Sequence, residues 1–214
     1  MVINTSILRK NNYINNFNYS GDFMKNFRFL AMLMIMTMLA FTSCDNDDGG
    51  DSSKTYAIGD TGPSGVGIVF YVTDGGLHGL EVAPVDQTSA TWSNITSTLI
   101  NTTGLVMGTG SENTDTIIGQ IGHTASAAQI CKNYRATEEG DWFLPSRDEL
   151  NAIWDNLVDD GSGYNNGVGV FAEYYYWSSS EHLSNDAWSV CFTNGSNTYY
   201  GKNDYFHVRA VRAF

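Results

Sequence analysis

One block of sequence determines both the start and the buried face of a helix. Ser146 and Glu149 stand three residues apart, a spacing at which the serine hydroxyl and the glutamate carboxylate can each accept the backbone N–H of the other residue. Pro145, just before the cap, biases Leu144 toward an extended backbone. We therefore predict a helix from Ser146 that ends near 159–161. Its buried stripe is expected to consist of the apolar residues at helical spacing: Leu150, Ile153, Trp154, Leu157 and Val158.

A second helix is predicted over about 114–134, upstream of the first. Apolar residues again recur there at steps of three and four, which places them on one face: Ile117, Ile118, Ile121, Ala125, Ala128 and Cys131. Gly119 and Gly122 weaken the first half, so the regular part can begin as late as His123 or Thr124. His123 has no second ligand one turn away and is interpreted as a surface or cap residue.

The segments on either side of these helices have the pattern of short strands. Residues 67–73 are β-branched and aromatic and stop at Asp74-Gly75-Gly76, which indicates a strand, a tight turn and a returning strand over 79–83. Beyond Gly161 further strands are expected, with Asn194-Gly195 as a hairpin turn: 174–178, 187–193, 197–201 and 207–212. Alternation at the end of the chain places four residues near the core: Phe206, Val208, Ala210 and Val211.

Composition sets the class of the chain. The 214 residues include 12 Tyr, 11 Phe and 5 Trp among 42% hydrophobic residues, enough to build one core and too many for a disordered or collagen-like chain. The formal net charge is −12. Because affinity for a phosphate backbone comes mainly from Lys and Arg, nucleic acid is not an expected partner.

The N-terminal region has the features of an export signal. Lys25 and Arg28 precede an apolar run over 29–41. That run is about 13 residues, or roughly 20 Å as a helix, which is shorter than the roughly 30 Å core of a bilayer. We interpret 24–43 as a signal peptide. Phe41-Thr42-Ser43-Cys44 resembles the lipobox of bacterial lipoproteins, which implies a lipid on Cys44; the alternative is an ordinary cysteine after a simple secretory signal.

The residues around this signal carry two further expectations. Residues 1–23 are rich in Asn, and a second start at Met24 directly precedes the basic residues, so 1–23 are interpreted as a mis-assigned start. Residues 44–55 are polar and acidic and predict a solvated tether. This tract also resembles the signal that sends some lipoproteins to the outer face of the outer membrane. The expected location is therefore the outer membrane, lipid-anchored and cell-surface exposed.

Two cysteines remain once Cys44 is set aside. In an oxidising compartment Cys131 and Cys191 are a natural disulfide pair, which would close a loop of about 60 residues and stabilise the fold by roughly 4 kcal/mol. The alternative is two buried free thiols. No His pair at ligand spacing and no Cys-x-x-Cys accompanies them, so neither a metal site nor a cofactor is predicted.

Four blocks together resemble the C-terminal domain of the Legionella collagen-like adhesin. They are 141–150 (DWFLPSRDEL), 176–181 (YWSSSE), 187–188 (AW) and 208–212 (VRAVR), and the resemblance spans roughly 56–214. It implies one α+β domain with a C-type-lectin-like fold, two helices packed on short and mostly antiparallel strands. The same family resembles formylglycine-generating enzymes. Trp177 and Trp188 are then expected as core or near-core anchors.

The resemblance and the surface location favour a non-catalytic binding domain for glycan or another extracellular ligand. A protein-interaction or structural lipoprotein of an outer-membrane assembly is the alternative. An enzyme is disfavoured, because Cys131 and Cys191 do not reproduce the paired catalytic cysteines of formylglycine-generating enzymes. Arg209 and Arg212 are expected to pair with carboxylates or carbonyls inside the domain. The acidic charge disfavours sulfated glycans as ligands.

The ligand site is expected on the irregular connections after the second helix, because loops vary without cost to the core. These connections are 181–186 and 199–205. They supply oxygen and amide groups that could bind sugar hydroxyls directly or through a calcium ion; the alternative is that they are solvated hairpin tips. The predicted ligand-binding residues are Glu181, Asn185, Asp186, Tyr200, Asn203 and Asp204.

Overall fold

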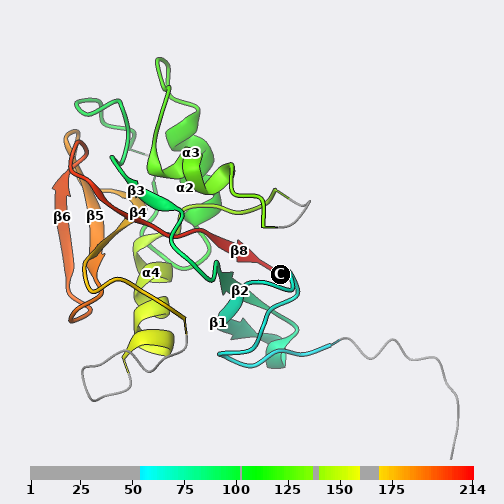
Figure 1. Ribbon diagram of the computed structural model, residues 1–214. Helices are drawn as coiled ribbons and strands as arrows, with labels where there is room; N and C mark the ends of the chain where they lie inside the picture. Colours follow the sequence, from blue (N-terminus) through cyan, green and yellow to red (C-terminus); the bar gives the residue numbers. More distant parts are fainter. Residues whose placement is uncertain (1–53, 102, 137–139, 160–168) are drawn as a thin grey trace, which may run out of the picture. The chain divides into compact units, whose positions relative to one another are not determined.

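The computed structural model describes residues 54–101, 103–136, 140–159 and 169–214, which form an α+β fold with two sheets (Figure 1). The smaller sheet is antiparallel, with strand order β1-β2-β8. Its strands are β1 (Ile68–Thr73), β2 (His78–Val82) and β8 (Val211–Ala213), and a short 3-10 turn over Asp74–Gly76 joins the first two. The first and the last strand of the domain therefore lie in one sheet.

The larger sheet has strand order β3-β7-β4-β5-β6. Its neighbours are antiparallel except β4 and β7, which run parallel. In Figure 1 β6 is the outermost strand of this sheet. The bounds are β3 (Thr88–Ala90), β4 (Tyr175–Glu181), β5 (Asp186–Cys191), β6 (Asn197–Gly201) and β7 (Phe206–Val208).

The predicted helix at Ser146 is confirmed as α4 (Arg147–Ile153), which continues into a π-helical turn over Trp154–Val158. The reciprocal cap is present: the Ser146 N–H donates to Glu149 Oε2 over 2.8 Å and the Glu149 N–H donates to Ser146 Oγ over 3.3 Å. The stripe residues Leu150, Ile153 and Leu157 are fully buried. Local sequence thus determines both the start of this helix and the face that it buries.

The single helix predicted over 114–134 is wrong in its extent. The structure has α2 (Gly110–Ile118) and α3 (Ala127–Lys132) with a connection between them. Gly119 ends α2, and Gly122 has a φ of 86°, a backbone conformation that favours glycine. Ser126 then starts α3 by accepting the N–H of Gln129. The glycines that weakened the predicted helix in fact divide it.

The predicted strand over 207–212 is also divided. Its first part is β7 in the larger sheet and its last part is β8 in the smaller one. Arg209 and Ala210 lie between them, both buried, and the change of sheet accounts for the break in alternation at this point. All four residues predicted near the core there are buried: Phe206, Val208, Ala210 and Val211.

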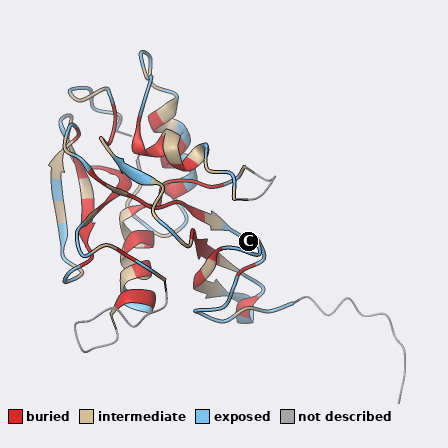
Figure 2. Ribbon diagram, in the orientation of Figure 1, coloured by how far each residue is buried: buried red, intermediate tan, exposed pale blue. Residues whose placement is uncertain are grey.

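Two apolar clusters lie on opposite faces of the larger sheet, whose strands β4 and β5 are largely buried (Figure 2). Tyr176 belongs to the cluster that contains α4, and Trp177 belongs to the cluster that contains α2 and α3, because successive residues of a strand point to opposite faces. Trp177 is fully buried, whereas Trp188 is half-buried. This agrees with their expected places in or near the core.

The expectation that two arginines pair within the domain is confirmed. Arg209 Nε donates to Asp86 Oδ1 over 2.7 Å and Nη1 donates to the Ala83 carbonyl over 2.9 Å. Arg212 Nε donates to Asp141 Oδ2 over 2.7 Å. Arg209 thus connects the last residues of the domain to Ala83 and Asp86, and Arg212 connects them to Asp141.

Glu149 does more than cap α4. Its Oε1 also accepts the backbone N–H groups of Gly108 and Gly110, over 2.8 and 3.3 Å, so one buried carboxylate holds the loop that leads into α2. Burial is the largest influence on this group and raises the pKa of the Glu149 carboxyl above its ordinary value, although the N–H donors act in the opposite direction.

Replacing this carboxylate should change both stability and its pH dependence. Glu149→Gln should lower the free energy of unfolding by about 1–3 kcal/mol, because the amide nitrogen cannot accept the N–H groups that the carboxylate oxygen accepts. A raised native pKa means that the native state holds more protons than the unfolded state just above pH 4.5. Stability therefore falls as pH rises through that window and is level above it.

Urea unfolding at a series of pH values measures both effects. The variant should be less stable throughout and should lose the part of the pH slope that Glu149 contributes. Ser146→Ala is the matched control, since it removes the other half of the cap without removing a titrating group. A variant that keeps the full slope would contradict the assignment.

Candidate functional site

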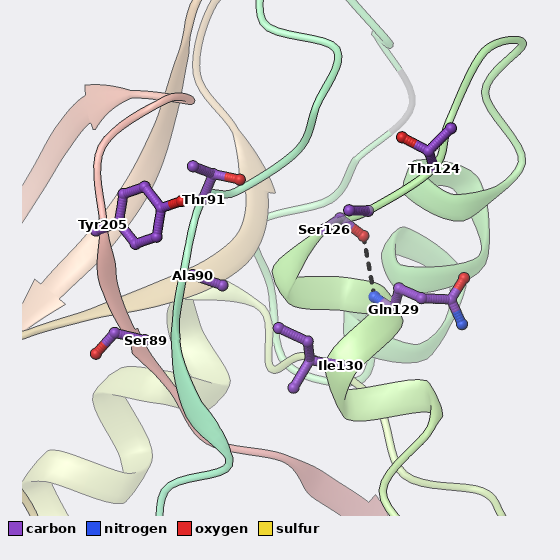
Figure 3. Close-up of a pocket in the computed structure, with 9 residues that line it drawn as sticks. Ser89, Ala90, Thr91, Thr124, Ser126, Gln129, Ile130 and Tyr205 are labelled. Atoms are coloured by element: carbon purple, nitrogen blue, oxygen red, sulfur yellow. Dashed lines mark hydrogen bonds between the residues drawn. The ribbon is translucent and has the colours of Figure 1, made fainter.

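A pocket of about 330 Å³ opens beside β3 (Figure 3). This volume is at the lower end of the range for small-molecule sites. Three segments far apart in sequence line it: the end of β3, the segment leading into α3 with the first turns of that helix, and Tyr205 from the connection between β6 and β7. The lining residues are Ser89, Ala90, Thr91, Thr124, Ala125, Ser126, Gln129, Ile130 and Tyr205.

Backbone contacts hold two walls of this pocket together. The Ala127 N–H donates to the Thr91 carbonyl over 3.1 Å, which joins the chain after β3 to the start of α3. The neighbouring Trp92 is fully buried, and its indole N–H donates to the Ser178 carbonyl over 2.8 Å. Trp92 therefore anchors this wall in the core of the larger sheet.

Asn94 holds the second wall from outside the pocket. Its side-chain oxygen accepts the backbone N–H groups of Thr124 and Ala125, over 2.8 and 3.2 Å. Its side-chain nitrogen donates to the Gly122 carbonyl over 3.0 Å. One amide side chain thus satisfies three backbone groups of an irregular segment, which fixes its shape.

The most buried polar residue of the pocket lining is Ser126. Its hydroxyl accepts the Gln129 N–H over 3.0 Å, the cap of α3, and lies 2.9 Å from His123 Nε2. Partial burial lowers the pKa of His123, because it disfavours the charged imidazolium. Of the described residues, none places a carboxylate in hydrogen-bond contact with His123, so the pair lacks the third group of a hydrolytic triad.

Tyr205 forms the open rim of the pocket. It is 69% exposed, and in Figure 3 its ring stands beside Thr91 and Ala90, across the pocket from Thr124 and Gln129. The lining as a whole contains hydroxyls, one amide and apolar carbon atoms but no charged side chain. Such a surface suits an uncharged ligand that presents both hydroxyl groups and a flat apolar face.

The loops predicted as the ligand site do meet. The Lys202 N–H donates to the Asn185 carbonyl over 2.8 Å, and Asp186 lies opposite Gly201 in the β5–β6 ladder. Asn185 and Asn203 are exposed, and Asp186 and Asp204 are half-buried. Tyr200 packs instead against the rings of Tyr175 and Phe206. The predicted residues therefore gather at one end of β5 and β6, next to Tyr205.

Glu181 is the member of this set that is used internally. It is 8% exposed, its carboxylate lies 2.6 Å from the buried Lys202 ammonium, and it accepts the backbone N–H groups of Ile100 and Asn101. Lys202 Nζ also donates to the carbonyls of Thr98 and Ser184. Every one of these contacts holds a loop, so the carboxylate has a structural role.

Removing one member of this buried ion pair should destabilise the folded domain. Lys202→Met should lower the free energy of unfolding by about 3–5 kcal/mol, because it leaves the Glu181 carboxylate buried without its counter-charge. Adding Glu181→Gln should recover part of the loss, since no net charge then remains buried. Chemical denaturation of the two variants measures the difference. A loss of less than 1 kcal/mol for Lys202→Met would show that water replaces the ammonium.

The predicted disulfide between the two cysteines is absent from the structure. Cys131 and Cys191 are free, buried thiols in the structure. Cys131 packs in the cluster between α3 and the larger sheet, whereas Cys191 ends β5 opposite Tyr175. Burial raises the pKa of the Cys131 thiol well above its usual value, which makes it unreactive. The structure thus has the alternative arrangement, two small apolar side chains.

The described residues contain neither a metal-binding cluster nor a membrane-spanning helix. They contain no group of three or more His, Cys, Asp or Glu side chains able to hold a metal ion. No helix in the part of the chain that the structure describes has the length and apolar character to cross a bilayer. Cys44, the predicted lipidation site, and the rest of 1–53 lie outside the described residues.

Two of the three pocket walls could not be found from the sequence. Ser89 to Thr91 lie in a segment rich in Ser, Thr and Asn that carries only loop signals. Thr124 to Gln129 fall inside the single helix predicted over 114–134, which gave no sign of the irregular segment before α3. Their proximity depends on the hydrogen bond from Ala127 to Thr91 and on the clamp by Asn94, which no local pattern reveals. Only Tyr205, at the end of the predicted 199–205 connection, was within reach of sequence analysis.

The fold and the pocket define a small α+β domain with two mostly antiparallel sheets and an uncharged cavity beside the larger one. The model of the Lcl C-terminal domain family matches residues 84–212. This is more than half of the chain and includes all three walls of the pocket, and the chain belongs to this family. Membership supports an adhesin-like surface protein. A comparison with curated proteins finds no significant match.

Proposed function

We propose that this chain is a surface-exposed lipoprotein whose lectin-like domain binds a neutral glycan, without catalysis, in the pocket beside Tyr205. The observation that carries the proposal is the lining: an exposed tyrosine ring faces hydroxyl and amide side chains, with no charged group among them. A sugar ring matches this surface because its C–H face can lie on an aromatic ring while its hydroxyls bond to polar groups.

The charge of the chain supports a neutral ligand. Residues 1–43 hold four of the 11 Lys and Arg but one of the 23 Asp and Glu, so residues 44–214 carry a net charge of −15. A field of this sign repels sulfated or carboxylated glycans unless a basic patch overrides it. The pocket offers no such patch, since none of its lining residues is basic.

The chemistry of the lining favours binding over turnover. A hydrolytic site needs a nucleophile with a base that a third group orients. Here the Ser126 hydroxyl is occupied as the cap of α3, and the serine is only 3% exposed. A lectin needs no such activation, because it only exchanges water for the hydroxyls of its ligand.

Removing the exposed ring tests the site. Tyr205→Ala should weaken binding to neutral glycans about tenfold or more, because the ring is the one large aromatic surface of the pocket. The melting temperature should stay within a few degrees, as expected for an exposed side chain. A glycan array with neutral, sialylated and sulfated members, run with and without calcium, identifies the ligand, and titration calorimetry then compares the variants.

Two controls place the site. Tyr174→Ala removes a tyrosine that is also about half exposed but lies outside the pocket, and it should leave affinity unchanged. Asn185→Ala with Tyr200→Ala reports on the loops predicted from sequence, and a loss confined to this double variant would move the site there. Hits only among sulfated glycans, or none at all, would refute the neutral-glycan proposal.

The lipid anchor is a separate part of the proposal. Cys44 follows an apolar export segment and precedes an acidic tract, the order in which a lipidated cysteine would tether the domain by a flexible linker. Cys44→Ser should release the protein from membranes and abolish labelling by a palmitate analogue. Fractionation of cells that express the full chain measures the first effect. A variant that stays in the membrane fraction and still takes up label would contradict lipidation at Cys44.

A further inference from the structure

Three of the four sheet edges in the described fold are covered or very short. The segment before β1 bonds to it, with the Gly59 N–H donating to the Val69 carbonyl and the Val69 N–H to the Asp60 carbonyl. Phe143 exchanges two backbone hydrogen bonds with Val211 of β8. On the larger sheet, β3 has only three residues. Native proteins commonly protect edges in these ways, because an open edge pairs with other chains.

The fourth edge, β6, has none of these protections among the described residues. It is five residues long, Asn-Thr-Tyr-Tyr-Gly, with no charge and no proline. Its register with β5 is regular from Asp186↔Gly201 to Val190↔Asn197, so it has no bulge. In Figures 1 and 2 it forms the outer side of the larger sheet and is largely exposed or half-buried.

The register shows which backbone groups point outward. The bonds from Cys191 N–H to the Ser196 carbonyl and from Lys202 N–H to the Asn185 carbonyl mark the hydrogen-bonded pairs at the two ends of the ladder. Because such pairs alternate along an antiparallel ladder, residues 198 and 200 bond to β5. The N–H and C=O groups of Asn197 and Tyr199 therefore face away from the sheet, where no described segment meets them.

We propose that β6 pairs antiparallel with β6 of a second copy of this chain, about a two-fold axis at Tyr199. In this register each Asn197 lies opposite Gly201 of the other copy, and the outward N–H and C=O groups bond across the axis. The larger sheets of the two copies then form one continuous sheet. The proposal is independent of the glycan pocket, whose lining includes no residue of β6.

Because β6 carries no charged residue, a second copy can pair with it although the chain as a whole is acidic. Both strands are uncharged, so no like charges oppose each other across the axis. The acids nearest the edge, Asp186 and Asp204, lie at the Gly201 end. Antiparallel pairing brings that end to the turn over 193–196 of the other copy, Thr-Asn-Gly-Ser, which carries no charge. A parallel arrangement would instead bring the acids of both copies together.

Pairing would also cover an exposed aromatic surface. Tyr199 is 49% exposed, and its ring is stacked on His182 at 3.9 Å between ring centroids, with Trp188 edge-on at 5.5 Å. Tyr199 lies at the proposed axis, so the aromatic clusters of the two copies would meet there. Their burial adds an apolar contribution to the main-chain hydrogen bonds.

A cysteine at the axis tests the register. Cells that express the full chain with Tyr199→Cys should give a disulfide-linked dimer on a non-reducing gel after mild oxidation, because directly opposite residues have Cα atoms within disulfide range. Thr193→Cys, in an exposed turn away from the axis, should give no disulfide-linked dimer on the same gel, and neither should the parent chain with its own cysteines. Adding Asn197→Pro to Tyr199→Cys should abolish the dimer, since proline removes an outward N–H at the first residue of the strand.

A second measurement does not depend on cysteine or proline. Sedimentation equilibrium of the full chain in detergent should show a concentration-dependent dimer, and Tyr199→Lys should shift it to monomer by placing two ammonium groups together at the axis. Thermal unfolding should be little changed by this exposed substitution. Equal cross-linking at positions 193 and 199, or a dimer that survives Tyr199→Lys, would overturn the proposal.

Discussion

The buried pair of Lys202 and Glu181 connects the sheet to loops that have little apolar surface of their own. Glu181 ends β4 and accepts the N–H groups of residues 100 and 101, and Lys202 follows β6 and donates to the Thr98 and Ser184 carbonyls. Trp92 covers the ammonium at 4.9 Å from its ring centroid. Two charges that would be costly alone thus satisfy each other and the backbone groups of two loops.

Other buried carboxylates act in the same way. Glu149 holds the loop before α2, and Glu81 accepts the backbone N–H and the hydroxyl of Ser64 beside Gly62 and Gly67, where any side chain would collide with the carboxylate. Long loops rich in Gly, Ser, Thr and Asn contain too few apolar side chains to be held in place by packing alone. Charged and amide side chains that collect several backbone N–H groups supply the missing constraint.

The parts of the fold that sequence could predict are those encoded by neighbouring residues. The Ser146 and Glu149 cap, the strand over 197–201 and the hairpin at Asn194-Gly195 each depend on residues a few positions apart. The pocket could not be predicted, because its walls meet through contacts of Trp92 and Asn94 with residues about 30 or more positions away. From sequence, the carboxylate of Glu181 is typical of an exposed ligand-binding residue. Only its contact with the buried Lys202 ammonium shows that it has a structural role. The two thiols likewise needed the packing of α3 and β5 to be placed.

The position of the last strands has a consequence for how the domain is made. Residues 206–213 supply an inner strand, β7, to the larger sheet and an edge strand, β8, to the smaller one. The smaller sheet, which contains the first strand of the domain, is therefore complete only when the last strand is present. Long-range pairing of this kind folds slowly. Neither sheet is complete until residues 206–213 have been synthesised. A nascent polypeptide with this topology therefore stays loosely packed until the last two strands of the domain are available for pairing.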